Sequence, residues 1–175
     1  LSISRLTEEK NVVLLLKMVA SILRKRKDAI FVLGGDGYLL KKLKKETKNL
    51  GVSKKVIFPG MIKKSEVKDY FAMTDVFVYA SQSETQGMII SEAMFAGLPV
   101  VALDANGVRD LVLNGETGRL VFENKQFGKE LRKILDNNDL QKKFSQKAKE
   151  RAERKYTDRA CALKMLDVYK KLLNS

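Results

Sequence analysis

Two glutamates, Glu84 and Glu92, have the residue type and the spacing to bind hydroxyl groups of a ligand. Residues 76–80, just before the pair, are apolar and strand-like, and residues 88–96 contain helix formers without a breaker. Glu84 is therefore expected in the loop at the carboxyl end of a strand, and Glu92 about one turn inside the following helix. Both carboxylates could accept hydrogen bonds from hydroxyl groups.

A helix that begins between these glutamates would also form an anion site. Its first backbone N–H groups have no partner within the helix. The residues that would supply them are Gly87, Met88 and Ile89. An anion site flanked by two hydroxyl acceptors fits a nucleotide sugar, which carries a diphosphate between a ribose and a sugar ring.

Two cations, Arg5 and Lys10, are expected at the end of the first strand and in the loop before the first helix. An Arg offers a bidentate fork to phosphate oxygens and a Lys offers a point charge. Together they could hold a diphosphate and neutralise the charge on a departing nucleotide. The chain has 34 Lys and Arg residues, so either one alone also fits an ordinary surface cation.

The run Gly34-Gly35-Asp36-Gly37 follows the second predicted strand and lacks the third glycine of G-x-G-x-x-G. Two interpretations stay open. The run could be a tight strand-to-helix turn with Asp36 near a helix start, or Gly35 and Gly37 could let a nucleotide approach the backbone.

These residues must be positioned by alternating strands and helices. Strand-like segments are predicted at residues 1–5, 29–33, 56–58, 76–80, 99–103 and 120–122, and everything from Gln126 onward reads as helix. Because the apolar strands do not alternate with polar residues, we expect an α/β fold with a parallel sheet covered on both faces. The prediction is a Rossmann-like, doubly wound sheet of about six strands, which binds ligands beyond the carboxyl ends of its strands. Residues 1–138 would form the nucleotide-sugar-binding domain, and 139–175 C-terminal helices that pack on it.

Length and composition set further bounds. The chain of 175 residues begins without Met, so we expect one domain of a longer protein. No apolar run approaches the ~20 residues needed to cross a bilayer. The single cysteine, Cys161, rules out an internal disulfide, is expected as a small buried residue, and fits the reducing cytoplasm.

The net charge is 34 minus 21, or +13, and comes mostly from lysine. Lysines on solvated helix faces would explain this charge, and so would binding to an anionic membrane surface. Few aromatic residues interleave with the lysines, so nucleic acid is not an expected partner.

The chain has no histidine, which excludes Ser-His-Asp triads, Cys-His pairs and His-based zinc sites from this segment. A glycosidase needs two carboxyl groups roughly 5–10 Å apart. Eight helical positions span about 12 Å, so the Glu84–Glu92 spacing disfavours that reaction.

Several motifs, in this order and spacing, resemble the C-terminal domain of retaining GT-B glycosyltransferases of family 4. They are Arg5-Leu6, Lys10-Asn11, Gly35-Asp36-Gly37, Glu84 to Glu92 followed by Ala93-Met94, Gly97-Leu98-Pro99-Val100-Val101 and Asn114-Gly115-Glu116-Thr117-Gly118. This resemblance implies one half of a GT-B fold that binds a nucleotide sugar, with UDP-sugars favoured, no further cofactor and no metal.

The resemblance also implies roles for single residues. Arg5 and Lys10 would grip the diphosphate, with the backbone of Gly87, Met88 and Ile89 completing the cradle. Glu92 would accept hydrogen bonds from the ribose, and Glu84 would meet the donor sugar. The segment from Phe58 to Gly60 would border the base.

The chain departs from the family pattern at two places. Asn106-Gly107-Val108-Arg109-Asp110 stands where Gly-Gly-x-Pro-Glu is common, and Gln86 stands where Phe is frequent. The string Glu84-Thr85-Gln86-Gly87 resembles the branch that glucosylates diacylglycerol. This branch implies a lipid acceptor and a peripheral place at the inner face of the cell membrane, while a saccharide acceptor stays open.

The resemblance further implies an absent N-terminal domain that contacts the acceptor, so this domain alone is expected to be inactive. The helices of 139–175 would cross to that domain or pack on this one, with Ala160, Leu163, Leu166, Tyr169 and Leu172 as the candidate buried face. Two other functions stay open: a nucleotide-sugar epimerase of the same architecture, and a non-catalytic basic interaction module.

Overall fold

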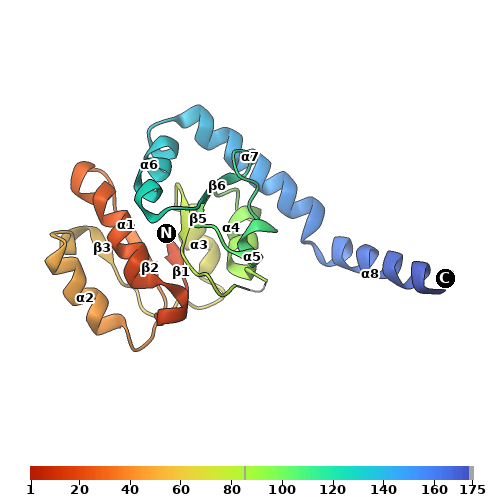
Figure 1. Ribbon diagram of the computed structural model, residues 1–175, viewed down its shortest axis with the longest axis horizontal. Coiled ribbons are helices and arrows are strands. Elements are labelled where there is room, and N and C mark those ends of the chain that lie inside the picture. The colour runs from red at the N-terminus through yellow and green to blue at the C-terminus, as the bar shows by residue number, and fades with distance from the viewer. Residues whose placement is uncertain (85, 174–175) are drawn as a thin grey trace.

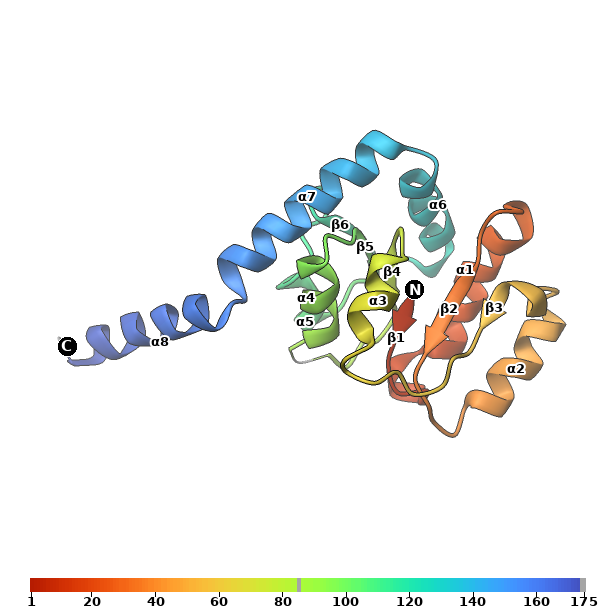
Figure 2. The same cartoon turned by 180° about the vertical axis from the view of Figure 1, so that it is seen from behind.

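The computed structural model describes residues 1–84 and 86–173 and shows a parallel sheet with helices on both faces (Figures 1 and 2). Within this part of the chain the strands are β1 (Ser2–Ile3), β2 (Phe31–Gly34), β3 (Val56–Ile57), β4 (Phe77–Tyr79), β5 (Val100–Leu103) and β6 (Gly118–Val121). Every predicted strand is found. β1 to β5 are shorter than the apolar segments that predicted them, whereas β6 begins two residues before its predicted segment.

The strands form two hydrogen-bonded ladders, β1-β2-β3 and β4-β5-β6, and all pairs are parallel. The Val78 N–H donates to the Leu1 carbonyl at 2.8 Å, which places β4 beside β1. The strand order is therefore 3-2-1-4-5-6, the order of a doubly wound sheet whose two halves meet between β1 and β4. The predicted fold class is confirmed.

Helices connect the strands, and those at residues 88–96 and from Gln126 onward were predicted. They are α1 (Val12–Lys25), α2 (Leu40–Asn49), α3 (Val67–Ala72), α4 (Met88–Phe95), α5 (Asn106–Arg109), α6 (Asn124–Leu135), α7 (Asn138–Lys155) and α8 (Asp158–Leu173), with short 3-10 turns η1 (Glu8–Lys10) and η2 (Ser53–Lys55). The apolar stripe of α1 is buried, as its i, i+3, i+4 spacing predicts.

Alternate residues of the central strands face two separate cores. Val78 of β4 lies in the core formed with α1 and α6. Its neighbours Phe77 and Tyr79 lie in the core formed with α4 and α7. Because both faces of β4 and β5 are buried, their sequence is continuously apolar rather than alternating.

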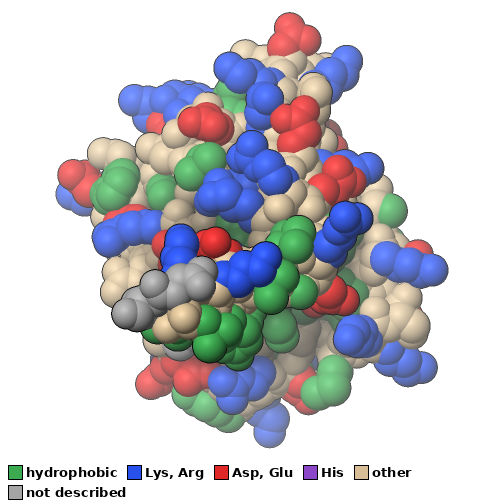
Figure 3. All heavy atoms as spheres, turned by 90° about the vertical axis from the view of Figure 1, so that its right-hand side faces the viewer, with side chains coloured by type: hydrophobic (Ala, Val, Ile, Leu, Met, Phe, Trp, Pro, Cys, Tyr) green, Lys and Arg blue, Asp and Glu red, His purple; other side chains and the backbone are tan. Residues whose placement is uncertain are grey.

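The last two helices differ in their packing. Helix α7 packs against α4 and α6, whereas α8 projects away from the domain and has no buried residue over Asp158–Leu173 (Figures 1 and 2). Viewed from the side of α8, the surface shows hydrophobic side chains among Lys and Arg (Figure 3). The expectation that Cys161 is buried is wrong, because this residue is exposed.

Leu163, Leu166 and Tyr169, named as candidates for a buried face, are exposed on α8. Packing of these side chains on this domain is therefore not seen. The division of the chain at residues 138 and 139 stays a prediction, and residues 174–175 lie outside the described part. Over that part, none of the helices combines the length and apolar character that a membrane span requires.

Candidate functional site

The predicted site residues all lie at the carboxyl edge of the sheet, in the loops after β1 to β4 or on α4. Parallel strands end at one edge, so residues far apart in the sequence are brought together there. The direct contacts centre on Glu84, which belongs to the loop between β4 and α4.

The Glu84 carboxylate binds three donors from three segments. Oε2 accepts from the Lys10 ammonium at 2.9 Å and from the Tyr79 hydroxyl at 2.6 Å. Oε1 accepts from the Gly87 N–H at 3.2 Å. The side chains of Lys10 and Glu84 are only 15% and 14% exposed, so water screens this ion pair less than a surface pair.

These contacts fix the ionisation state of the site. Burial by itself would raise the pKa of the Glu84 carboxyl, but the hydrogen bonds from Tyr79, Lys10 and Gly87 together hold it below its ordinary range. Burial and the Glu84 carboxylate raise the pKa of the Tyr79 hydroxyl. Glu84 is therefore an anion at neutral pH and Tyr79 a neutral donor.

Helix α4 begins with a left-handed residue. Gly87 is its N-cap with φ of 58°, and a Cβ there would lie 2.4 Å from Leu111 Cδ1. Glycine avoids both the strain of this conformation and the clash. Within residues 1–84 and 86–173, the N–H groups of Met88 and Ile89 have no acceptor. Two backbone donors therefore lie at the helix start, and their predicted role as an anion site stays a prediction.

Glu92 lies four residues after Met88, which places both on the same face of α4, and both are exposed. The predicted start of the helix and the place of Glu92 one turn inside it are confirmed. No side-chain hydrogen bond or ion pair joins Glu92 to the other site residues in the described part of the chain, so its predicted role stays a prediction.

The side chains of Arg5 and Lys10 form ion pairs with different glutamates. The Arg5 guanidinium binds Glu9 Oε1 at 2.5 Å and is largely exposed, while Lys10 binds Glu84. The Glu9 carbonyl accepts from the Ser81 hydroxyl at 3.3 Å, which ties η1 to the loop after β4. Both cations thus lie at one edge, although they share no partner among the described residues.

The glycine run after β2 is a close-packed segment, and the turn before α2 follows it, at Tyr38 and Leu39. The Gly35 N–H donates to the Gly60 carbonyl at 2.8 Å, which joins the ends of β2 and β3. A Cβ at Gly35 would lie 1.9 Å from the Ser4 carbonyl oxygen, and one at Gly37 would lie 2.5 Å from that of Leu6. The run therefore leads into the turn rather than forming it, and a role in nucleotide binding stays a prediction.

Phe58, expected near the base, is partly buried against the core that includes α1. Its neighbour Gly60 lies at the carboxyl edge through its bond to Gly35. The segment therefore reaches the expected edge, while the Phe58 ring contributes to packing.

Sequence reasoning missed Tyr79 and Glu9. Tyr79 ends β4, and a hydroxyl at the end of an otherwise apolar strand signals that its tip meets a polar group. Glu9 stands one residue before Lys10 but carried no signal of its own, because it acts through its backbone carbonyl and its bond to Arg5.

The loop that departs from the family pattern is held by an ion pair. Arg109 Nε donates to Asp104 Oδ1 at 2.6 Å, and a second nitrogen of Arg109 binds Oδ2. These bonds lower the pKa of the Asp104 carboxyl. Gln86 is exposed beside Gly87, and Thr85 of the same string lies outside the described residues.

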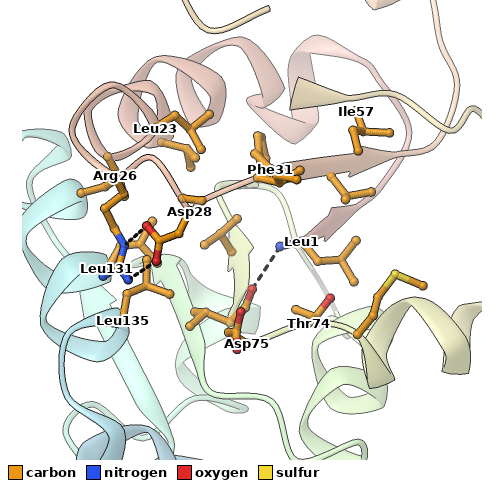
Figure 4. A pocket seen from close by; sticks show the side chains of 18 of the residues that line it. Leu1, Leu23, Arg26, Asp28, Phe31, Ile57, Thr74, Asp75, Leu131 and Leu135 are labelled. Carbon is orange, nitrogen blue, oxygen red and sulfur yellow. Dashed lines mark hydrogen bonds and ion pairs between the residues drawn. The ribbon is translucent and has the colours of Figure 1, made fainter. Parts of the chain in front are cut away.

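A cavity of about 360 Å³ lies at the opposite, amino edge of the sheet. Figure 4 shows that Leu23, Phe31 and Leu131 line it, with the Arg26–Asp28 ion pair at one side. None of the predicted site residues lines this cavity. Over residues 1–84 and 86–173, no group of three or more His, Cys, Asp or Glu side chains could hold a metal ion.

A 3-2-1-4-5-6 sheet with cations and a helix start at its carboxyl edge defines a Rossmann-like domain. The family model for glycosyl transferases group 1 matches residues 1–151. The alpha-monoglucosyldiacylglycerol synthase of Streptococcus pneumoniae is 37% identical over 122 residues, which are 70% of this chain and 28% of that protein.

Two solved structures show the same fold. One is the C-terminal domain of a glycosyl transferase group 1 family protein (LpcC) from Francisella tularensis, at 25% identity and a TM-score of 0.82, covering 90% of this chain and 85% of that chain. The other is a TarM mutant from S. aureus in complex with fondaparinux, alpha-GlcNAc-glycerol and UDP, at 24% identity and a TM-score of 0.88. This second match covers 96% of this chain and 34% of that chain.

The chain therefore belongs to the glycosyl transferases group 1, family 4, and forms the C-terminal, donor-binding half of a GT-B fold. It spans about a quarter to a third of the length of the pneumococcal synthase and of TarM.

Proposed function

We propose that this domain binds a UDP-sugar for a retaining hexosyltransferase. One observation carries the proposal: the Lys10 ammonium and the N–H at the start of α4 converge on the Glu84 carboxylate. A cation and a helix N-terminus that together bind one carboxylate create a positive electrostatic potential, which would also attract a diphosphate. UDP in the TarM complex supports the choice of base.

In this proposal the diphosphate lies at the N–H groups of Met88 and Ile89, beside Lys10 and Arg5. The breaking bond to the sugar leaves negative charge on the departing diphosphate. Cationic side chains and helix N–H groups stabilise that charge without a metal ion, because they are fixed before the reaction begins. The N–H groups of Met88 and Ile89 have no acceptor in the described chain. A diphosphate could therefore bind them without breaking a hydrogen bond to another described residue.

The two glutamates would orient the rest of the donor. Glu92 would accept hydrogen bonds from the ribose, and Glu84 would accept them from hydroxyl groups of the sugar. A carboxylate whose pKa is held low by Tyr79 and Lys10, against the effect of burial, stays ionised and accepts hydrogen bonds. Phe58 to Gly60 would border the base, and Gly35 and Gly37 would let the nucleotide approach the backbone.

A lipid is the proposed acceptor. The string from Glu84 to Gly87 and the similarity to the pneumococcal synthase support diacylglycerol, and the +13 charge favours an anionic membrane surface at the inner face of the cell membrane. The longer enzyme should glucosylate diacylglycerol in mixed micelles. Transfer to a soluble saccharide with no transfer to diacylglycerol would contradict this acceptor.

We also expect the isolated domain to be inactive, because the acceptor would be bound by a second domain of the longer protein. Sugar transfer by the 175-residue chain would refute this expectation. The match to a glycosyltransferase family removes support from the epimerase and from the basic interaction module.

Calorimetric titration of the 175-residue chain with UDP, GDP, UDP-glucose and UDP-galactose tests the donor site. Saturable binding of UDP that weakens in Arg5→Ala and Glu92→Ala supports the assignment, whereas tighter binding of GDP would contradict the proposed base. Arg24→Ala and Glu153→Ala remove exposed charges elsewhere on the domain and should leave the affinity unchanged. Equal loss in these controls would show that general charge, and not the site, binds the nucleotide.

A further inference from the structure

Arg151 of α7 is buried without an acidic partner. The residue is only 8% exposed, and over residues 1–84 and 86–173 no carboxylate forms an ion pair with it. A buried charge is costly unless its donors are satisfied, so its contacts indicate what the residue does.

The guanidinium is satisfied by the backbone of one turn. Arg151 Nε donates to the Leu111 carbonyl at 2.8 Å, and Nη2 donates to the Asp110 carbonyl at 2.7 Å. Tyr156 places its ring 5.9 Å from the guanidinium carbon, and its hydroxyl donates to the same Asp110 carbonyl at 2.7 Å. Two side chains from the end of α7 therefore clamp the turn that follows α5.

This turn contacts the start of α4. Leu111 is buried, and its Cδ1 occupies the space where a side chain on residue 87 would begin, 2.4 Å from an ideal Cβ. Gly87 holds the left-handed conformation from which its N–H reaches Glu84 and from which α4 begins. A shift of Leu111 would free Gly87 to change conformation and would turn the first N–H groups of the helix away from the anion site.

We propose that Arg151 is a positioning residue that fixes the start of α4 for diphosphate binding, through the Asp110 and Leu111 carbonyls and the Leu111 side chain. This inference rests on the proposed donor site. A planar fork can hold two consecutive carbonyls, which the single ammonium of lysine cannot do in the same geometry. The position therefore requires Arg rather than positive charge alone.

The test compares the affinities for UDP and for uridine, because the α4 N–H groups contact only the diphosphate. Calorimetry on the 175-residue chain gives the ratio of the two dissociation constants. In Arg151→Met the preference for UDP over uridine should fall by about 10-fold or more, since donors to an anion are lost or misplaced. The affinity for uridine should not change, which a general loss of structure would not allow.

Arg119→Met is the matched control. Arg119 also stacks on an aromatic ring, with its guanidinium carbon 5.4 Å from the Phe144 centroid, but its ion pair is with Glu130 and not with the turn. This variant should keep the preference for UDP. Arg151→Lys should lose most of the preference, because it restores the charge but not the fork.

Two further variants cover the case in which Arg151→Met does not fold. Tyr156→Phe removes one donor to Asp110 and keeps the ring, so the preference should fall by about 3-fold. Leu111→Ala removes the contact with Gly87 and should lower the preference with uridine affinity kept. An unchanged preference in Arg151→Met, or in both Tyr156→Phe and Leu111→Ala if Arg151→Met is unfolded, would overturn the inference. Absence of any UDP preference in the unsubstituted chain would instead contradict the donor site itself.

Discussion

The carboxyl edge of the sheet brings together Lys10, Glu84 and the first N–H groups of α4. At the amino edge, a cavity of about 360 Å³ is lined mostly by apolar side chains such as Leu23 and Leu131. The cavity offers volume, but two of the charged side chains that line it, Arg26 and Asp28, already form an ion pair with each other. The carboxyl edge offers donors that have no acceptor in the described chain, so the chemistry of these groups supports the proposed ligand site at this edge rather than in the cavity.

We expect the largest loss of stability from a substitution that disturbs the close backbone packing at the carboxyl edge. Gly35 has φ of 121°, and a Cβ there would lie 1.9 Å from the Ser4 carbonyl oxygen. Gly35→Ala should therefore lower the free energy of unfolding by on the order of 4 kcal/mol, or prevent folding, because backbone must move. Urea denaturation measures the loss.

Gly51→Ala is the control for conformation alone. Gly51 also has a positive φ, of 69°, but no atom lies within 4 Å of its Cβ position. This variant should lose only about 1–2 kcal/mol, the cost of the left-handed conformation. Equal losses in the two variants would mean that the close approach of Gly35 to β1 is not what stabilises the edge.

A second prediction separates stability from binding at the amino edge. Leu131 is buried in the core with α1 and lines the cavity. Leu131→Ala should lower the free energy of unfolding by about 3 kcal/mol, since it removes buried methylene groups and enlarges the cavity. UDP affinity, measured by calorimetry below the melting temperature, should stay unchanged. Lost affinity in a folded variant would show that the amino edge contributes to the ligand site.

A third prediction addresses the cation at the carboxyl edge. Lys10→Met should weaken UDP binding by about 1.5–3 kcal/mol, or roughly 10- to 150-fold, because a charged donor to the diphosphate is lost. Lys17→Met is the control, since Lys17 also forms an ion pair, with Glu46, but lies on α1 away from the edge. Similar losses in both variants would indicate nonspecific attraction by the positive charge of the chain.

Periodicity and composition predicted most of the fold, because each buried strand and the stripe of α1 leave a local pattern. The contacts within the site were less accessible. Lys10 and Glu84 are 74 positions apart and meet because β4 lies beside β1, an adjacency that residue types do not encode locally. The amphipathic pattern of α8 likewise predicted a buried face, although α8 projects away from the domain and has no buried residue over Asp158–Leu173 (Figures 1 and 2). A pattern shows that a helix has an apolar face, but not which surface covers it.

The smallest predicted effect is a difference in acid sensitivity between the two edges. Burial raises the pKa of Glu84, but three hydrogen bonds outweigh it and hold the pKa below its ordinary range. A carboxyl whose pKa is lower in the folded state stabilises the fold above its unfolded pKa, and that stabilisation is lost as the pH falls through the folded pKa. The free energy of unfolding should therefore fall less steeply on acidification in Glu84→Gln than in the unsubstituted chain.

Asp28 also has a lowered pKa, caused by its hydrogen bond from Arg26, but its side chain is 70% exposed. Solvent screens such a pair, so Asp28→Asn should change the slope less than Glu84→Gln does. Urea denaturation between about pH 7 and pH 3 covers the range in which carboxyl groups titrate. A larger change of slope in Asp28→Asn would mean that the amino edge, and not the Glu84 cluster, dominates the acid response.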